Sequence, residues 1–252
     1  LAEIGEENAE FNVVEKSGKI ALERVQDGEL FKFPGRGGVM QELIPTDDNY
    51  RSLKDILSNY AQGKFLKNLE LGNPDYNVEI SLIPVRVENN VVVDTIDVRT
   101  IMDEGGMPQF GKQDRALIKI VNNSNFPVYF NIIDIQPDGR INAVVPNPAK
   151  NENPADFRIG AKESFIIRGK YITFSPPYGT EIFKVFASYS PLNFAPILTT
   201  RGAGDTRGLS NNLEKLFANS YSMSRGAGVE SLSTDADAAT FSYTFKIVSN
   251  RN

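Results

Sequence analysis

Residues 129–148 have the sequence YFNIIDIQPDGRINAVVPNP, and this stretch decides the fold. Two apolar runs flank the turn at residues 136–140. In that turn Pro137 presets the backbone, Asp138 accepts a local backbone hydrogen bond and Gly139 takes the left-handed conformation. The pattern predicts a buried β-hairpin.

One carboxylate, Asp134, lies among the isoleucines of this predicted hairpin. A buried acid is tolerated when its oxygens accept hydrogen bonds, so we expect Asp134 to accept from N–H groups of the turn or to pair with Arg140 across the hairpin. We therefore interpret Asp134, Asp138, Gly139 and Arg140 as a structural anchor. A catalytic role is disfavoured because the chain has no histidine to act with the acid.

Short strand-like runs continue on both sides of the hairpin. They are separated by turn signals at intervals typical of an antiparallel sandwich. Expected strands cover residues 11–15, 19–25, 78–87, 91–98, 116–121, 128–136, 140–145, 164–168, 171–174, 181–189 and 241–247. Pro84 predicts an edge strand or a bulge.

Two helices are expected. Leu53, Ile56, Tyr60 and Leu66 follow helical spacing within residues 50–69, and a shorter helix covers residues 213–219. The predicted fold is mainly β: a β-sandwich of antiparallel strands with one long and one short packed helix. We expect residues 1–252 to form a single compact unit, in which 1–75 form an N-terminal hairpin plus helix and 76–252 form the sandwich.

Composition excludes several kinds of chemistry. The 252 residues are 40% hydrophobic, which is enough for a large core, and they contain no cysteine and no histidine. The usual thiol nucleophile, imidazole base and zinc ligands are therefore missing. A net charge of −5 argues against nucleic acid as a partner. No apolar run is long enough to predict a membrane span.

The known catalytic and phosphate-binding motifs are also missing. No serine lies in a G-x-S-x-G motif, and no Gly-Lys pair is followed by serine or threonine as in a P-loop. Asp235 and Asp237 lack the glycine and glutamate of an EF-hand. We predict no metal site and no cofactor. A calcium site built from several loops stays open.

Paired carboxylates leave one alternative, because glycoside hydrolysis needs only two suitably spaced acids. Asp134 and Glu181 are the acids that a carbohydrate-binding or carbohydrate-cleaving sandwich would use. For a binding module without catalysis, the candidate contacts lie at the loop tips 146–154 and 175–180. The candidate residues are Asn147, Tyr178 and Glu181.

Several ordered pieces of the chain carry a resemblance. They are NFPVYFNIIDI at 125–135, PDG at 137–139, PN at 146–147, SPPYGTE at 175–181, FKV at 183–185 and AS at 187–188. Together they resemble a bacterial domain of unknown function that commonly follows a caspase-like (metacaspase-type) cysteine peptidase domain. The resemblance covers about residues 112–190, and residues 68–71 resemble the segment that joins the two domains.

The resemblance implies an accessory role rather than catalysis, since the His and Cys of the peptidase belong to the preceding domain. The implied module positions, regulates or tethers a protease, or binds its ligand, and its partners are the upstream peptidase domain and an unknown protein or glycan. Because the sequence begins at Leu1, we expect it to be part of a longer protein. Zero cysteines leave the compartment open, with a lean to an exported or cell-surface bacterial protein. An adhesin-like structural domain is a further alternative that differs only in its genetic context.

Overall fold

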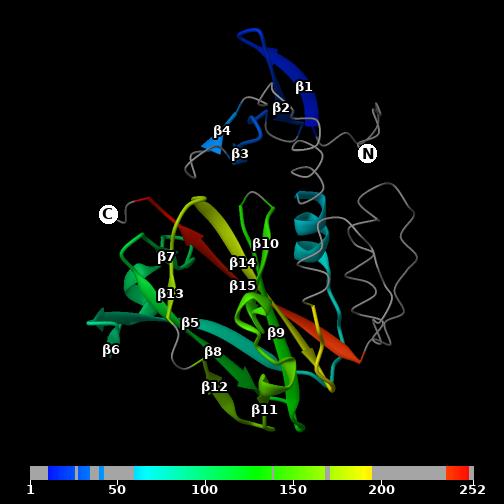
Figure 1. The fold of residues 1–252 in the computed structure, drawn as a ribbon, viewed down its shortest axis with the longest axis vertical. Coiled ribbons are helices and arrows are strands. Elements are labelled where there is room, and N and C mark those ends of the chain that lie inside the picture. Colours follow the sequence, from blue (N-terminus) through cyan, green and yellow to red (C-terminus); the bar gives the residue numbers. More distant parts are fainter. Residues whose placement is uncertain are drawn as a thin grey trace.

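The structure, a computed structural model, describes residues 11–25, 28–34, 40–42, 60–137, 139–167, 171–194 and 237–249. It is mainly β, with two antiparallel sheets packed face to face, which confirms the predicted sandwich (Figure 1). A helix covers the outer face of the larger sheet.

The larger sheet contains the predicted hairpin of residues 128–145. Its neighbours are antiparallel, apart from one short parallel pair between its last two strands. In order across the sheet the strands are β10 (Ile141–Val145), β9 (Val128–Ile135), β14 (Gly179–Ser188), β15 (Ala238–Ile247) and β7 (Gln109–Phe110), with β11 (Arg158–Ile159) also on β9.

The smaller sheet is formed mainly by residues that precede this hairpin. In order its strands are β12 (Ser164–Ile166), β8 (Arg115–Asn122), β5 (Val78–Glu88) and β6 (Val91–Thr95), with β13 (Ile172–Thr173) also on β8. In β8 buried and half-buried residues alternate along the strand, as the period of a strand packed on one face requires.

The core between the two sheets is rich in aromatic residues. The rings of Phe110 and Phe174 stack with centroids 4.2 Å apart, and Phe245 meets Phe110 edge-on at 5.7 Å. Phe245 is fully buried, as are Phe130 and Ile132 of β9. Phe245 and Ile247 of the last strand thus face this core, with Phe241 and Tyr243 packed against it.

The N-terminal hairpin forms a two-stranded sheet of its own. It consists of β1 (Phe11–Lys16) and β2 (Lys19–Arg24), which are joined by Ser17 and Gly18 with φ of 55° and 72°. A second short pair follows, β3 (Phe33–Pro34) with β4 (Met40–Gln41). Both predicted strands of the first hairpin are confirmed.

Residues 60–68 are helical, within the long helix that the sequence predicts. Leu66 and Leu69 are buried against Ile133 of β9 and Phe186 of β14, whereas Lys67 is exposed. The predicted start of this helix and the predicted short helix at 213–219 lie outside the described residues. Within the described part of the chain, no helix has the length and apolar character needed to cross a membrane.

Pro84 does not lie in an edge strand, because β5 continues through it with β8 on one side and β6 on the other. The carbonyl of Pro84 accepts from the N–H of Ile96 at 2.7 Å, so the missing N–H of the proline also faces Ile96, beyond the end of β6. No bond to β8 is lost. A bulge does lie close by, where the partners of Arg86 and Val87 shift in register.

β6 leaves apolar side chains exposed at the side of the molecule. All five of its residues are exposed, including Val91 at 61% and Val93 at 46%. Among the described strands β6 pairs with β5 alone.

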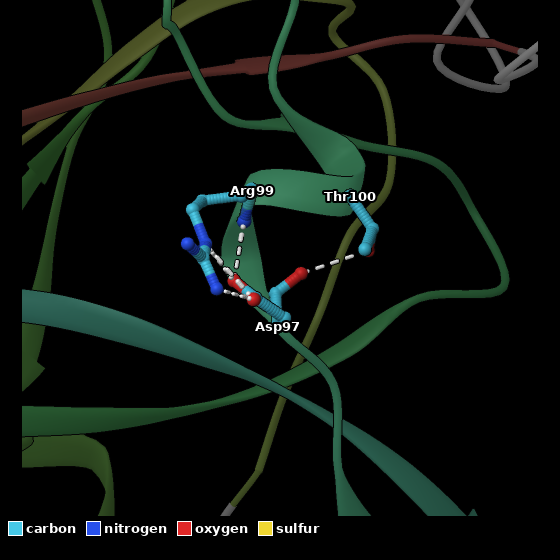
Figure 2. A network of polar contacts seen from close by, with 3 residues as sticks. All are labelled: Asp97, Arg99 and Thr100. Atoms are coloured by element: carbon cyan, nitrogen blue, oxygen red, sulfur yellow. Dashed lines mark hydrogen bonds and ion pairs between the residues drawn. The ribbon is translucent and has the colours of Figure 1, made fainter.

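A short 3-10 helix, η2 (Val98–Ile101), follows β6 and begins at Asp97 (Figure 2). The Asp97 carboxylate accepts from the backbone N–H of Arg99 at 3.0 Å and pairs with the Arg99 guanidinium, while Thr100 donates to the Asp97 carbonyl at 2.7 Å. The bonds from the Arg99 side chain and backbone N–H lower the pKa of Asp97 to about 2.

Candidate functional site

Two glycines bring the helix against the turn of the β9–β10 hairpin. Gly139 has φ of +81°, and a Cβ on it would meet Cα of Tyr60 at 2.5 Å. A Cβ on Gly63 would meet the carbonyl oxygen of Gly139 at 2.6 Å. The positive φ confirms the left-handed conformation predicted for Gly139. The lack of a side chain at both glycines also allows the helix and the turn to approach this closely.

The turn itself is closed by backbone hydrogen bonds. The N–H of Gln136 donates to the carbonyl of Arg140 at 2.9 Å, and the N–H of Gly139 donates to the carbonyl of Gln136 at 2.9 Å. Asp138, the remaining predicted anchor of the turn, lies outside the described residues.

The N-terminal hairpin reaches the same helix through three aromatic rings. Phe11, Phe31 and Tyr60 meet edge-on in pairs, with centroids 5.2 to 5.3 Å apart. This contact places the end of β2 beside the helix, because Phe11 is the strand partner of Arg24. Arg24 also pairs with Glu29 at 2.8 Å.

A cavity of about 650 Å³ lies where the end of β2, the helix and the β9–β10 turn meet. Its cationic wall comes from Arg24, Lys64 and Lys67. None of the described residues that line it carries a carboxylate. The cavity is therefore a locally basic site in a chain whose net charge is −5.

The rest of the wall is apolar or neutral. Val25, Ile135, Pro137 and Ile182 supply apolar surface. Gln136 also lines the cavity, and its Oε1 is buried with no hydrogen-bond partner among the described residues.

Lys184 lies under the end of the helix and is the most deeply buried charged residue among the described ones. Its side chain is 1% exposed, its Nζ donates to the carbonyl of Lys67 at 3.2 Å, and it lies 3.6 Å from Oε1 of Glu70. The ammonium thus meets a carbonyl at the negative end of the helix. Burial lowers the pKa of Lys184, and the exposed Glu70 opposes that shift only in part.

The two embedded acids lie on the inner face of the larger sheet. Asp134 is directly paired with Phe183, a member of the core between the sheets, and Glu181 is two residues from Phe183 on the same face. The acids are therefore diagonal neighbours, with α-carbons roughly 7–8 Å apart. Asp134 is 8% exposed and Glu181 is 5% exposed, and neither lines the cavity.

One hydrogen bond to Asp134 comes from Asn142, a residue that was not among the predicted anchors. Nδ2 of Asn142 donates to Oδ2 of Asp134 at 3.4 Å, directly across the β9–β10 hairpin. The expected partners of this carboxylate were Arg140 or the N–H groups of the turn.

The structure does not bring the three predicted binding residues into one site. Tyr178 is 44% exposed, in the loop before β14, whereas Glu181 is buried. Asn147 caps a different loop: its Oδ1 accepts from the N–H of Ala149 at 3.0 Å, at the start of the 3-10 helix η3 (Pro148–Lys150). None of these three residues lines the cavity.

The residues that sequence reasoning missed are Arg24, Lys64, Lys67, Gln136 and Lys184. Four of them line a cavity built from segments far apart in the sequence, so no local spacing marks them. Lys184 had a usable signal, because it is the one charged residue in the apolar run IFKVFA at 182–187.

The described residues contain no group of three or more acidic residues that could hold a metal ion. No family model, curated protein or solved structure matches the chain.

Proposed function

We propose that this chain is a non-catalytic recognition module of a larger caspase-like peptidase, and that the cavity beside the helix is where its partner binds. The observation that carries the proposal is the cavity wall, in which Arg24, Lys64 and Lys67 stand beside apolar side chains without a carboxylate among the described lining residues. Such a wall has groups for binding and orienting a ligand.

The placement of the acids supports a role without catalysis. General acid and base catalysis needs a titratable group within hydrogen-bond reach of the substrate. Asp134 and Glu181 face the core between the sheets, and the chain has neither histidine nor cysteine to take their place.

The resemblance to the domain that follows caspase-like peptidases supports the context of the proposal. Its residues form β9 and β14 and the turns beside them, which are central to the larger sheet. Those positions relate to the fold, whereas the cationic residues of the cavity, Arg24, Lys64 and Lys67, precede the resembling region of residues 112–190. The ligand is accordingly inferred from the cavity.

Two measurements test the proposal. The purified chain should not hydrolyse peptide substrates, and it should bind the purified upstream domain of its parent protein or a ligand of that domain in a titration. Peptidase activity from this chain alone would refute the proposal.

An alternative is carbohydrate recognition, which one observation favours. The ring of Tyr189 is 47% exposed and stacks on Phe126 at 4.5 Å, with Tyr76 edge-on beneath it. Exposed tyrosine rings supply amphipathic contact area. On a glycan array, Tyr189→Ala should abolish any signal that this platform produces, while Tyr178→Ala should leave it unchanged.

The cleaving form of this alternative depends on Asp134 and Glu181. Their diagonal placement has the proximity that a pair of catalytic acids requires, but their burial denies them a solvent-facing cleft. Glycan turnover that Asp134→Asn abolishes would favour this alternative over the recognition module.

A further inference from the structure

We infer that the cavity between the end of β2, the helix and the β9–β10 turn binds an acidic peptide segment whose carboxylates alternate with apolar side chains. This inference rests on the recognition function proposed above and names the class of its ligand.

The charge of the cavity is the first reason. Lys64 and Lys67 are exposed and three residues apart on the helix, so they lie on one side of it, and Arg24 joins them from β2. Arg24 pairs with Glu29, whose side chain is 72% exposed, and an exposed pair of this kind contributes little to stability. Charge complementarity therefore favours an anionic ligand.

The apolar part of the cavity wall restricts the chemical class of the ligand further. Ile135 and Ile182 are directly paired on neighbouring strands, and Pro137 and Val25 extend the apolar surface. An inorganic anion or a phosphodiester chain would leave that surface uncovered, whereas a peptide with leucine or isoleucine beside glutamate would cover it. The acidic character of the whole chain also disfavours a polyanionic nucleic acid.

Gln136 adds a hydrogen-bonding reason. Its buried Oε1 accepts no bond within the described residues, and an acceptor left in this state costs free energy. A turn of the side chain toward the cavity would offer this oxygen to a backbone N–H, which a peptide supplies and a phosphate does not.

The experiment measures fluorescence anisotropy with the whole chain at low ionic strength. The probe is a blocked, fluorescein-labelled hexapeptide in which glutamates alternate with leucines. Three comparison arms use the same peptide with glutamine for glutamate, a labelled single-stranded oligonucleotide, and competition by inorganic phosphate.

Two double variants distinguish binding at the cavity from attraction by the net charge of the chain. The pair Lys64→Glu with Lys67→Glu reverses the cationic wall, and Lys112→Glu with Lys150→Glu makes the same change of net charge at exposed lysines away from the cavity. Gln136→Leu tests the amide. Circular dichroism and thermal unfolding of each variant confirm that it is folded.

The expected result is binding of the glutamate peptide about tenfold tighter than the glutamine peptide, which corresponds to a few exposed charge contacts. The Lys64 and Lys67 variant should lose about tenfold, the Lys112 and Lys150 variant less than about twofold, and added salt should weaken binding.

The inference is overturned if the two peptides bind equally, if the control variant weakens binding as much as the cavity variant, or if the oligonucleotide or phosphate binds the cavity more tightly than the peptide. These outcomes differ from failure of the proposed function. A chain that binds its upstream domain but ignores the glutamate peptide keeps the recognition role and loses only this ligand class.

Discussion

Lys184 gives the sharpest test of how the helix is held on the sheet. Its stem lies beside Ile133 of β9, on the face of the sheet that the helix covers, and among the described residues its ammonium meets the Lys67 carbonyl and the exposed Glu70. Shortening Lys184 to alanine removes three methylenes, worth about 0.8 kcal/mol each, and a helix-end contact worth about 0.5 kcal/mol. We therefore expect Lys184→Ala to lower the free energy of unfolding by about 3 kcal/mol.

Lys184→Met is the matched variant, because it keeps most of the apolar volume and removes the charge. Replacing a buried charge by an apolar side chain of similar size is often neutral or stabilising, so we expect a change within about 1 kcal/mol. Urea unfolding followed by circular dichroism measures both variants. If Lys184→Met destabilises the fold as much as Lys184→Ala, the charge rather than the stem holds the helix, and the reasoning fails.

The stability difference between the native chain and Lys184→Met should depend on pH. Burial lowers the pKa of folded Lys184 below its ordinary value of 10.5, so the unfolded chain binds more protons between the two pKa values. The burial penalty is complete below the folded pKa and fades as pH rises toward 10.5. The native chain should therefore gain stability relative to Lys184→Met over that window, and a flat or falling difference would contradict the assignment.

Three further predictions follow from single contacts. Gly139→Ala should lower the free energy of unfolding by about 3 kcal/mol, because it adds a clash with Tyr60 to the strain at positive φ. The control Gly106→Ala, with φ of +77° and open space around it, should lower it by about 1 kcal/mol. Equal losses of stability in urea unfolding would refute the close packing. Asn122→Ala should lower the free energy of unfolding by about 3 kcal/mol in the same assay. This fully buried side chain donates to the carbonyls of Phe126 and Gly160 and accepts from the N–H of Ser124. A loss under about 1 kcal/mol would show that water replaces those bonds. The pKa of Asp97, about 2 in the folded chain, means that its stabilising contact is present above pH about 4 and is lost as pH falls toward 2. In a carboxyl NMR titration, the variant lacking the Arg99 guanidinium should have an Asp97 pKa shifted upward toward the ordinary value, with the backbone N–H of residue 99 still lowering it in part; an unchanged pKa would contradict the assignment.

Much of the sandwich could be predicted because its strands follow local rules. The period of two along residues 241–247 and the turn at 136–140 each state their structure within a few residues. The expected strand at 181–189 is also present as β14, and both its faces are buried, since it lies between the helix on one face and the smaller sheet on the other.

What could not be predicted depends on contacts between distant segments. Pro84 predicted an edge strand or a bulge, and the structure has a bulge two residues further on, at Arg86 and Val87, in a strand that is not at an edge. Only the register shows that the pairing with β6 ends at Val85, one residue after the proline. The candidate site was missed for the same reason. Arg24, Lys64 and Gln136 are ordinary surface residues in sequence, and they share a cavity only because Gly63 and Gly139 let two backbones touch.

The exposed strand β6 has a consequence for the behaviour of the protein at high concentration. A straight outer strand carrying three valines would be a template on which further copies could stack into fibrils. The register shift in β5 and β6 leaves Val93 as the additional residue, and Asp94 adds a charge directly after it. This irregularity breaks the flat hydrogen-bonding edge, and it disfavours the stacking of further copies on the apolar strand.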